Sequence, residues 1–270
     1  MMDKEEYNIN WNRFLLPYQQ AVDELSLKFT SLKNQYLALG EHSPIENVNA
    51  RVKNPDSILE KAKKNSFPLD QIDLMIKDIA GIRIVTQFEE DINLIFGLIK
   101  LRSDMKVVTI KDYLTNPKPS GYKSIHIIVE YEVNTVNGAE TILCEIQIRT
   151  LAMDFWSTIE HSLNYKYQDA MPSSIKKRLI SAADAINEID REMGNIREEI
   201  TEAQRLFRQK SQMVNNIIDQ MNRLSSYGRK DLVRKYYKIF TEMREADNTV
   251  QLMLLQKELE KEIKHLSNNH

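Results

Sequence analysis

The stretch ILCEIQIRT, residues 142–150, has the alternating pattern of a β-strand with two different faces. One face is apolar and carries Ile142, Cys144, Ile146 and Ile148. The other face ends in Glu145, Gln147 and Arg149. Exposure to solvent would be enough to explain such a polar face on a single strand. The alternative is that this face belongs to a functional site. The preceding strand helps to decide between a solvated face and a site.

The segment GYKSIHIIVEY, residues 121–131, is expected to pair with this strand in a β-hairpin. Asn137-Gly138, which lies between the two strands, is the strongest short hairpin signal that a sequence offers. A two-residue turn at this dipeptide pairs Val136 with Ala139. The position of the turn thereby determines which residues of the two strands face each other.

This register predicts that polar side chains from both strands share one face of the sheet. It places His126 opposite Arg149 and Glu130 opposite Glu145. The shared face would contain Tyr122, Ser124, His126, Glu145, Gln147 and Arg149. Two carboxylates that face each other are destabilising unless a cation or a proton lies between them. Solvation alone would still explain the polarity, but a site with a metal ion explains the combination better.

The composition indicates a folded protein without a general affinity for nucleic acid. The chain has 270 residues, 42% of them hydrophobic, and its 37 basic and 39 acidic residues give a net charge of −2. A sizeable core is therefore expected, and the overall basic field of a general nucleic-acid binder is absent. Cys144 is the single cysteine, which excludes an internal disulfide or a cysteine-built metal site and suits a reducing cytosol. No apolar run approaches the ~18 residues of a membrane span and the N-terminus lacks a signal-peptide pattern, so a soluble, cytoplasmic protein is expected.

Hydrophobic spacing predicts helices and strands as far as about residue 150. Helices are expected over residues 11–39, 56–65 and 89–101. Strands are expected over residues 46–53, 78–88, 105–113, 122–133 and 141–149. Asp56 or Ser57 would cap the second helix. From Leu151 onward the pattern is helical, so the sequence predicts an α+β fold in which long C-terminal helices follow the sheet.

A seam of apolar residues alternately four and three apart marks the helix that is expected from residue 175. The seam consists of Ile175, Leu179, Ala182, Ile186, Ile189, Met193, Ile196, Ile200, Ala203 and Phe207. Its partner is either another part of this chain or another subunit. SSYG at 225–228 should interrupt the helix, and one last helix should follow. We therefore expect a domain over 1–170, an oligomerisation helix over 171–211 and a helical extension over 212–270.

Basic residues gather in the sequence upstream of the polar strand face. They are Arg51, Lys53, Lys61, Lys63, Lys64, Lys77, Arg83, Lys118 and Lys123. Each alone is explained as a surface charge, but around a sheet that bears carboxylates they would form a cradle for a polyphosphate. Asp78 lies among them and would either bind a metal ion or cap a turn. The chain contains no P-loop and no protein-kinase motif set, so any nucleotide would be bound by another arrangement.

Several segments of the chain, taken in order, resemble one enzyme family. They are HSPIENVNARVKNPDSILEKAKK (42–64), KDIAGIRIVTQF (77–88), SGYKSIHIIVEY (120–131), EIQIRTLAMDFWSTIEHSLNYKY (145–167) and the long helix that follows. The sequence resembles the small alarmone synthetases, single-domain relatives of the RelA–SpoT synthetase domain. The resemblance implies a nucleotidyltransferase-like mixed sheet flanked by helices. It also implies the GTP diphosphokinase activity of the stringent response, in which pyrophosphate passes from ATP to the ribose 3′-hydroxyl of GDP or GTP, giving ppGpp or pppGpp and AMP.

The resemblance assigns roles to particular residues of this sequence. ATP would be bound by Arg51, Lys53, Ser57, Lys61, Lys64 and Arg83. GDP or GTP would be bound by Lys118, Tyr122, His126 and Gln147. Within that set Tyr122 would stack on guanine, and Lys118 and His126 would contact the phosphates. Asp78 and Glu145 would form the catalytic pair that holds Mg²⁺, or Mn²⁺ in its place, although Glu145 would alternatively polarise the attacking hydroxyl.

The resemblance also favours a homotetramer and leaves other functions to be considered. The chain has no His-Asp set like that of the hydrolase domain in larger relatives, so synthesis without hydrolysis is expected. Asn47, Asn49 and Ala50 depart from the pattern of the family's allosteric alarmone site. The alternatives are a catalytically weak module that binds alarmone or single-stranded RNA, and a coiled-coil interaction protein. The basic segment 228–238 is either an RNA contact or a solvated face, and the preferred acceptor among GTP, GDP and GMP stays open.

Overall fold

The computed structural model describes residues 9–167, 171–245 and 249–267. The chain divides into two compact units, Met1–Gly194 and Asn195–His270. The boundary falls within one long helix. The division into 1–170, 171–211 and 212–270 that the sequence suggested therefore stays a prediction.

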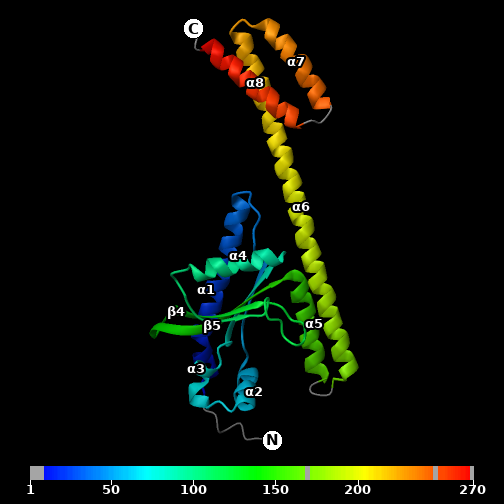
Figure 1. Cartoon of the computed structure of the whole chain (residues 1–270). Coiled ribbons are helices and arrows are strands. Elements are labelled where there is room, and N and C mark those ends of the chain that lie inside the picture. The colour runs from blue at the N-terminus through cyan, green and yellow to red at the C-terminus, as the bar shows by residue number, and fades with distance from the viewer. Residues whose placement is uncertain (1–8, 168–170, 246–248, 268–270) are drawn as a thin grey trace. The chain divides into compact units, whose positions relative to one another are not determined.

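The first unit contains one five-stranded sheet. Its strands are β1 (Asn47–Val52), β2 (Ala80–Thr86), β3 (Lys106–Asp112), β4 (Ile125–Thr135) and β5 (Gly138–Thr150), in the order β1-β2-β5-β4-β3. β2 and β5 run parallel, and all other neighbours are antiparallel. Figure 1 shows the sheet with helices at its flanks. The expected mixed sheet of an α+β fold is confirmed.

Helices α1 (Trp11–Ala38) and α4 (Glu89–Lys100) pack against the apolar side of this sheet. Their buried side chains form one continuous core with the inward-facing residues of the strands, such as Ile82 and Ile146. The short elements α2 (Pro55–Asn65), a 3₁₀ turn (Leu69–Gln71) and α3 (Ile72–Met75) connect β1 to β2. Cys144 lies fully buried in the core, where burial raises the pKa of its thiol to about 12. This burial agrees with the place of Cys144 on the apolar face of its strand.

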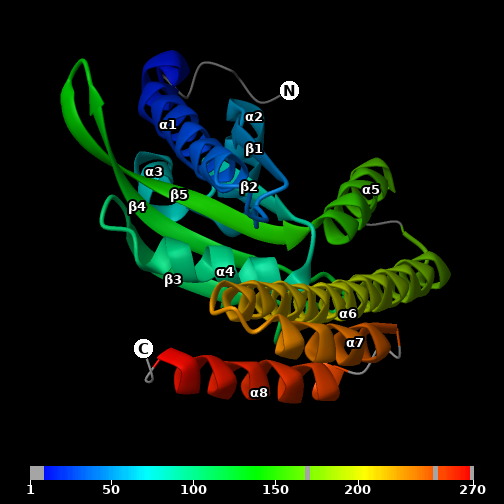
Figure 2. The same cartoon turned by 90° about the horizontal axis from the view of Figure 1, so that it is seen from above.

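The turn of the β4–β5 hairpin lies one residue earlier than predicted. Thr135 pairs with Gly138, so Val136 and Asn137 form the turn instead of Asn137 and Gly138. The Thr135 hydroxyl accepts the Asn137 N–H at 3.1 Å and donates to the Gly138 carbonyl at 3.0 Å. These two hydrogen bonds account for the position of the turn. Figure 2 shows the turn end of the hairpin projecting beyond the other strands.

The earlier turn changes the register by two residues but leaves every side chain on its predicted face, because side chains alternate with a period of two. His126 therefore lies opposite Gln147 rather than Arg149. The expected facing of Glu130 and Glu145 is wrong. Glu130 instead forms an ion pair with Lys106 of β3, at 2.9 Å.

Helix α2 begins earlier than the expected cap. Asn54 is the N-cap residue, and its side chain accepts the Ser57 N–H at 2.8 Å. Pro55 occupies the first helical position, where its fixed φ suits the helix and its missing N–H costs nothing. Neither Asp56 nor Ser57 is the cap, because Pro55 already starts the helix.

Helix α5 (Leu151–Tyr167) and the part of α6 (Ser173–Ser226) that belongs to the first unit cover part of the polar face of the sheet. Met153 and Trp156 of α5 and Ala183 of α6 form a small apolar cluster around Tyr122. The Trp156 indole N–H donates to the Leu179 carbonyl at 3.1 Å and joins the two helices. This cluster closes one end of the polar face.

The second unit consists of the rest of α6 together with α7 (Lys230–Glu245) and α8 (Thr249–Ser267). Its core contains Ile217, Met221, Leu224, Tyr236, Phe240, Leu252, Leu255, Leu259 and Ile263. The prediction of one last helix is wrong, because the apolar side chains of α7 and α8 pack against each other as separate helices. In the described ranges no helix is both long and apolar enough to cross a membrane.

The apolar seam of α6 is partly covered and partly exposed. Ile186 packs on the cluster around Tyr122, whereas Ile189 and Met193 are 53% and 45% exposed. Ile200 and Phe207 are exposed as well. This chain therefore covers only the start of the seam, and the partner of the remainder is not found among the residues that the structure describes.

Gly121 is a position at which the fold requires glycine. It has a φ of +84°, and a Cβ placed there would lie 2.6 Å from the Ala183 Cβ. We expect Gly121→Ala to destabilise the protein by ~1–3 kcal/mol, through backbone strain and overpacking. A methyl group added at Gly97, within helix α4, would meet no atom within 4 Å, so Gly97→Ala should stabilise by ~0.5–1 kcal/mol. Urea unfolding of both variants checks this, and effects of the same sign would contradict it.

Candidate active site

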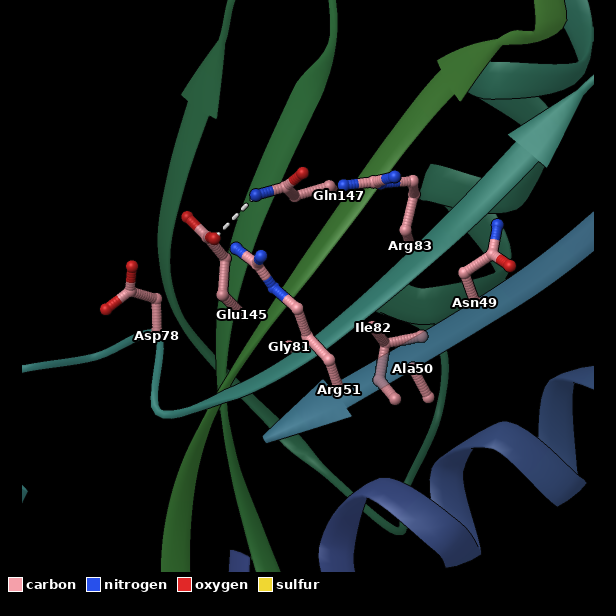
Figure 3. A pocket seen from close by; sticks show the side chains of 9 residues that line it. All are labelled: Asn49, Ala50, Arg51, Asp78, Gly81, Ile82, Arg83, Glu145 and Gln147. Carbon is pink, nitrogen blue, oxygen red and sulfur yellow. Dashed lines mark hydrogen bonds between the residues drawn. The ribbon is translucent and has the colours of Figure 1, made fainter. Parts of the chain in front are cut away.

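The polar face of the sheet contains two adjoining hollows, of about 350 and 380 Å³. The first is lined by Asn49, Ala50, Arg51, Asp78, Gly81, Ile82, Arg83, Glu145 and Gln147 (Figure 3). The second is lined by Arg51, Arg83, Lys118, Ser120, Tyr122, His126, Gln147, Arg149, Ser157, Thr158, Glu160 and His161. Both volumes are in the range of small-molecule sites. Three residues line both hollows: Arg51, Arg83 and Gln147.

The strand register explains why a hollow forms above β2. Gly81 pairs with Arg51 of β1 on one side and with Glu145 of β5 on the other. Since Gly81 has no side chain, the space between these two charged groups stays open. Arg83 and Gln147, the next pair on the same face, form the boundary with the second hollow.

Glu145 is held by hydrogen bonds from two neighbours on the polar face. Gln147 Nε2 donates to Oε2 at 2.7 Å, and His126 Nδ1 lies 3.1 Å from Oε1. His126 Nε2 in turn lies 3.1 Å from the Tyr122 hydroxyl. Burial alone would raise the pKa of Glu145, but the hydrogen bond and charge of His126 and the hydrogen bond from Gln147 outweigh it and lower the pKa. Glu145 is therefore a carboxylate at neutral pH.

Asp78 lies at the same end of the first hollow and is neutralised by two lysines. Lys53 Nζ donates to Oδ2 at 2.6 Å, and Lys61 Nζ lies 2.8 Å from Oδ1. The Lys61 ammonium is thus the group that compensates the buried Oδ1. Burial would raise the pKa of Asp78, but the two lysines lower it overall. Figure 3 shows the Asp78 and Glu145 carboxylates at one end of the hollow. The negative charge of Asp78 partly opposes the lowering of the Glu145 pKa.

A buried arginine connects β5 to α5. Arg149 is 2% exposed, and its Nε and Nη2 lie 2.8 and 2.6 Å from Asp154 Oδ1. Its Nη1 donates to Ser157 Oγ at 2.7 Å and lies 3.4 Å from the Tyr122 hydroxyl. Arg83 reaches the same Asp154 carboxylate at 3.4 Å. One carboxylate thus balances two guanidinium groups at the boundary between the hollows.

Most residues that the sequence assigned to nucleotides lie in these hollows. Five line the first: Arg51, Asp78, Arg83, Glu145 and Gln147. Lys118, Tyr122 and His126 line the second, and Lys53 and Lys61 reach the first through Asp78. Ser57 and Lys64 on α2 line neither hollow. Sequence reasoning missed Asp154, because nothing in the pattern of α5 indicates that this position turns toward Arg149.

The carboxylates do not form a dense metal-binding cluster. Within the described ranges, no group of three or more His, Cys, Asp or Glu side chains is placed to hold a metal ion. Asp78 and Glu145 therefore offer two oxygen donors to a cation, which would need further ligands from outside the protein.

Comparisons with known proteins identify the family of this chain. Residues 50–170 match a family model described as a region found in RelA / SpoT proteins. Over 200 residues the chain is 50% identical to the GTP pyrophosphokinase YjbM of Bacillus subtilis. This alignment covers 74% of this chain and 94% of YjbM. The chain belongs to the small alarmone synthetases. The resemblance found in the sequence is thereby confirmed.

Two solved structures of the small alarmone synthetase 1 of Bacillus subtilis are similar to this synthetase. The one bound to its product pppGpp has a TM-score of 0.68 and 49% identity, and covers 70% of this chain and 97% of that one. The one bound to AMPCPP has a TM-score of 0.63 and 46% identity, and the match covers 71% of this chain and 98% of that one. Roughly a quarter of this synthetase thus lies outside the similarity to these relatives.

A buried hydrogen bond attaches α6 to the end of β5, beside the site. The Thr150 hydroxyl donates to Asp190 Oδ2 at 2.6 Å, and both residues are buried. Burial raises the pKa of Asp190, the hydrogen bond from Thr150 lowers it, and the charges of Glu89 and Lys123 act in opposite directions. The net direction is upward, so ionised Asp190 destabilises the fold.

We expect Asp190→Asn to stabilise the synthetase at neutral pH, because the amide oxygen still accepts the Thr150 hydrogen bond without a buried charge. A carboxyl whose pKa is raised by folding lowers stability as pH rises from its unfolded pKa, about 3.9, through its folded pKa. The gain in melting temperature should therefore be present at pH 7 and vanish below about pH 4. Asp184→Asn, at an exposed position of the same helix, is the control. A gain that is independent of pH would contradict this explanation.

Proposed function

We propose that this synthetase transfers pyrophosphate from ATP to the ribose 3′-hydroxyl of GDP or GTP, giving ppGpp or pppGpp and AMP, without hydrolysing them. The observation that carries the proposal is the position of Glu145. It is an ionised carboxylate in the first hollow, and both residues that hydrogen-bond it, His126 and Gln147, line the second. A hydroxyl of a molecule in one hollow can therefore meet a phosphate of a molecule in the other at this carboxylate.

The first hollow suits the triphosphate of ATP. Arg51 and Arg83 line it, and Lys53 and Lys61 converge on its edge at Asp78. Guanidinium groups bind phosphate through two parallel hydrogen bonds, whereas ammonium groups act as point charges. A relative that is bound to AMPCPP supports an adenine nucleotide as a ligand of this synthetase. Ser57 and Lys64, on α2 outside the hollow, would contact ATP only at its periphery.

The second hollow suits the guanine nucleotide. Lys118 lines it together with Tyr122, His126 and Gln147, which agrees with the roles implied by the family. A relative that is bound to its product pppGpp supports a guanine nucleotide as a ligand of this synthetase. Tyr122 is only 6% exposed and Lys118 Nζ lies 4.8 Å from its ring centroid, so stacking on guanine requires the ammonium to move off this ring.

The reaction then follows from positioning and charge neutralisation. Glu145 accepts a hydrogen bond from the 3′-hydroxyl and withdraws its proton as the oxygen attacks the β-phosphorus of ATP in line. The O3′–Pβ bond forms, the bond from Pβ to the α–β bridging oxygen breaks, and AMP leaves with that oxygen. Arg51 and Arg83 stabilise the negative charge that develops on the phosphate oxygens.

Asp78 and Glu145 fit a hard cation such as Mg²⁺, or Mn²⁺ in its place. The half-buried Asp78 carboxylate, whose oxygens both lie next to cations, supports this use. Asp78 and Glu145 would hold such an ion, which would supply positive charge to offset the charge of the transferred group. In this structure, however, Lys53 and Lys61 already neutralise Asp78. We therefore infer that the phosphates of ATP must draw these lysines away before Asp78 can serve as a ligand.

We expect Lys61→Gln to tighten Mn²⁺ binding in the nucleotide-free protein roughly tenfold, because a positive charge next to the carboxylate is removed. The same variant should bind AMPCPP more weakly. Electron paramagnetic resonance titration with Mn²⁺ measures the first effect and calorimetry the second. Lys63→Gln, on the exposed side of the same helix, should change neither. Unchanged Mn²⁺ affinity in Lys61→Gln would show that the lysine does not compete for Asp78.

We also propose that the synthetase is a cytoplasmic homotetramer. The exposed part of the α6 seam, including Ile189 and Met193, supports assembly through this helix, because such apolar stripes are normally covered. The requirement for ATP and guanine nucleotides supports the cytoplasm as its location.

A product assay tests the proposed reaction. The protein is incubated with Mg²⁺, GTP and ATP labelled at the β-phosphate, and label is expected on a guanosine pentaphosphate with an equal amount of AMP. Glu145→Gln should lower turnover at least about a hundredfold, because the amide cannot accept the proton. Glu130→Gln, on the same sheet face but paired with Lys106, is the matched control and should keep full activity. Release of ADP instead of AMP would contradict attack at the β-phosphorus.

A further inference from the structure

The ammonium group of Lys118 lies between two aromatic rings at the wall of the second hollow. Its Nζ is 4.7 Å from the ring centroid of Tyr113 and 4.8 Å from that of Tyr122. The two centroids are 6.4 Å apart and the ring planes meet at 58°. Both distances are well within the range of a cation–π interaction.

Lys118 has no carboxylate in direct contact. Across residues 9–167, 171–245 and 249–267 no ion pair joins it to an acid, whereas Lys53 and Lys61 are both paired with Asp78. Burial lowers the pKa of Lys118, and the more distant charges of Glu145 and Glu160 oppose this. The rings thus hold the cation beside the hollow without neutralising it, which leaves its N–H groups available to a phosphate.

Tyr113 is held in place by the backbone rather than by Lys118. Its N–H donates to the Ser124 carbonyl at 2.9 Å, which continues the pairing of β3 with β4. Asp112 accepts the N–H groups of Leu114 and Thr115 and fixes the turn that follows. The ring of Tyr113 stands edge-on to His126, with centroids 5.3 Å apart. Tyr113 does not line the hollow itself, so it acts on a ligand through the lining residues that its ring faces, which are Lys118, Tyr122 and His126.

We propose that Tyr113 is a positioning residue of the acceptor site, which keeps the Lys118 ammonium directed at the 5′-phosphates of the guanine nucleotide. This inference rests on the proposed function of the second hollow. Guanine that stacks on Tyr122 displaces Lys118 from that ring. Tyr113 is then the aromatic surface that remains, and it retains the ammonium at the wall of the hollow where the phosphates lie.

The proposal makes the electron-rich ring of Tyr113 essential and its hydroxyl dispensable. Binding of GDP is measured by calorimetry without ATP, so that the result does not depend on turnover. Tyr113→Phe should bind GDP like the unmodified protein. Tyr113→Leu should weaken GDP binding roughly tenfold, as expected for loss of a partly desolvated cation–π contact. Pentafluorophenylalanine at position 113 keeps the ring shape but reverses its charge distribution, and should weaken binding as leucine does.

Two comparisons separate positioning of Lys118 from a general structural role. Guanosine, which has no phosphate, should lose no affinity in Tyr113→Leu, and binding of AMPCPP should also stay unchanged. In a Lys118→Met background, Tyr113→Leu should cause no further loss of GDP affinity, since the residue acts through the lysine.

Several outcomes would overturn the proposal. They are equal losses for guanosine and GDP, a pentafluorophenylalanine variant that binds GDP normally, and an additive loss in the Lys118→Met background. Should Tyr113→Leu fail to fold, the two ring-preserving variants still decide the question. Failure of pyrophosphate transfer, with these binding results intact, would refute the proposed reaction and leave the role of Tyr113 in place.

Discussion

The parallel pairing of β2 with β5 is the constraint on which the site depends. It places Gly81 beside Glu145 and Arg83 beside Gln147, so the floor of one hollow and the boundary with the next come from two adjacent pairs. A slip of one residue would turn Arg83 into the apolar core and the buried Ile84 toward the cleft. The isoleucines on the opposite side of the same strands make such a slip very unfavourable. The hydrophobic core thereby fixes where the charges of the site lie.

The site accommodates its cations in three chemically different ways. Lys53 and Lys61 share a carboxylate, Arg149 is fully buried with Asp154, and Lys118 rests on aromatic rings. Buried charges need such partners, because an isolated ion in the protein interior is strongly destabilised. The three kinds of partner differ in how readily they release the cation. Arg149, with its several hydrogen bonds, is part of the framework, whereas the lysines can change partners when a phosphate arrives.

The sequence predicted correctly on which face of the sheet a side chain lies, but it did not predict correctly which residue pairs with it on the neighbouring strand. Alternation alone places His126 and Glu145 on one face, whereas the register depends on hydrogen bonds of Thr135 that no pattern reveals. The nucleotide assignments came from family resemblance, and most of those residues do meet in the two hollows. The contacts of Asp154 with Arg149 and Arg83 depend on the direction in which α5 leaves β5. The sequence pattern shows Tyr113 only as an aromatic residue at the end of a strand. The division of the last helix was missed because residues 239–252 contain neither glycine nor proline.

The burial of Cys144 has a practical consequence. It is the only cysteine in the chain, it lies fully inside the core, and its thiol has a pKa of about 12. Since only the thiolate reacts with alkylating reagents, the native protein should be nearly inert to them. A cysteine introduced at an exposed position, such as Val136 at the hairpin tip, would then be the single attachment point for a fluorophore or spin label. Site-specific labelling for spectroscopy therefore does not require that Cys144 first be replaced.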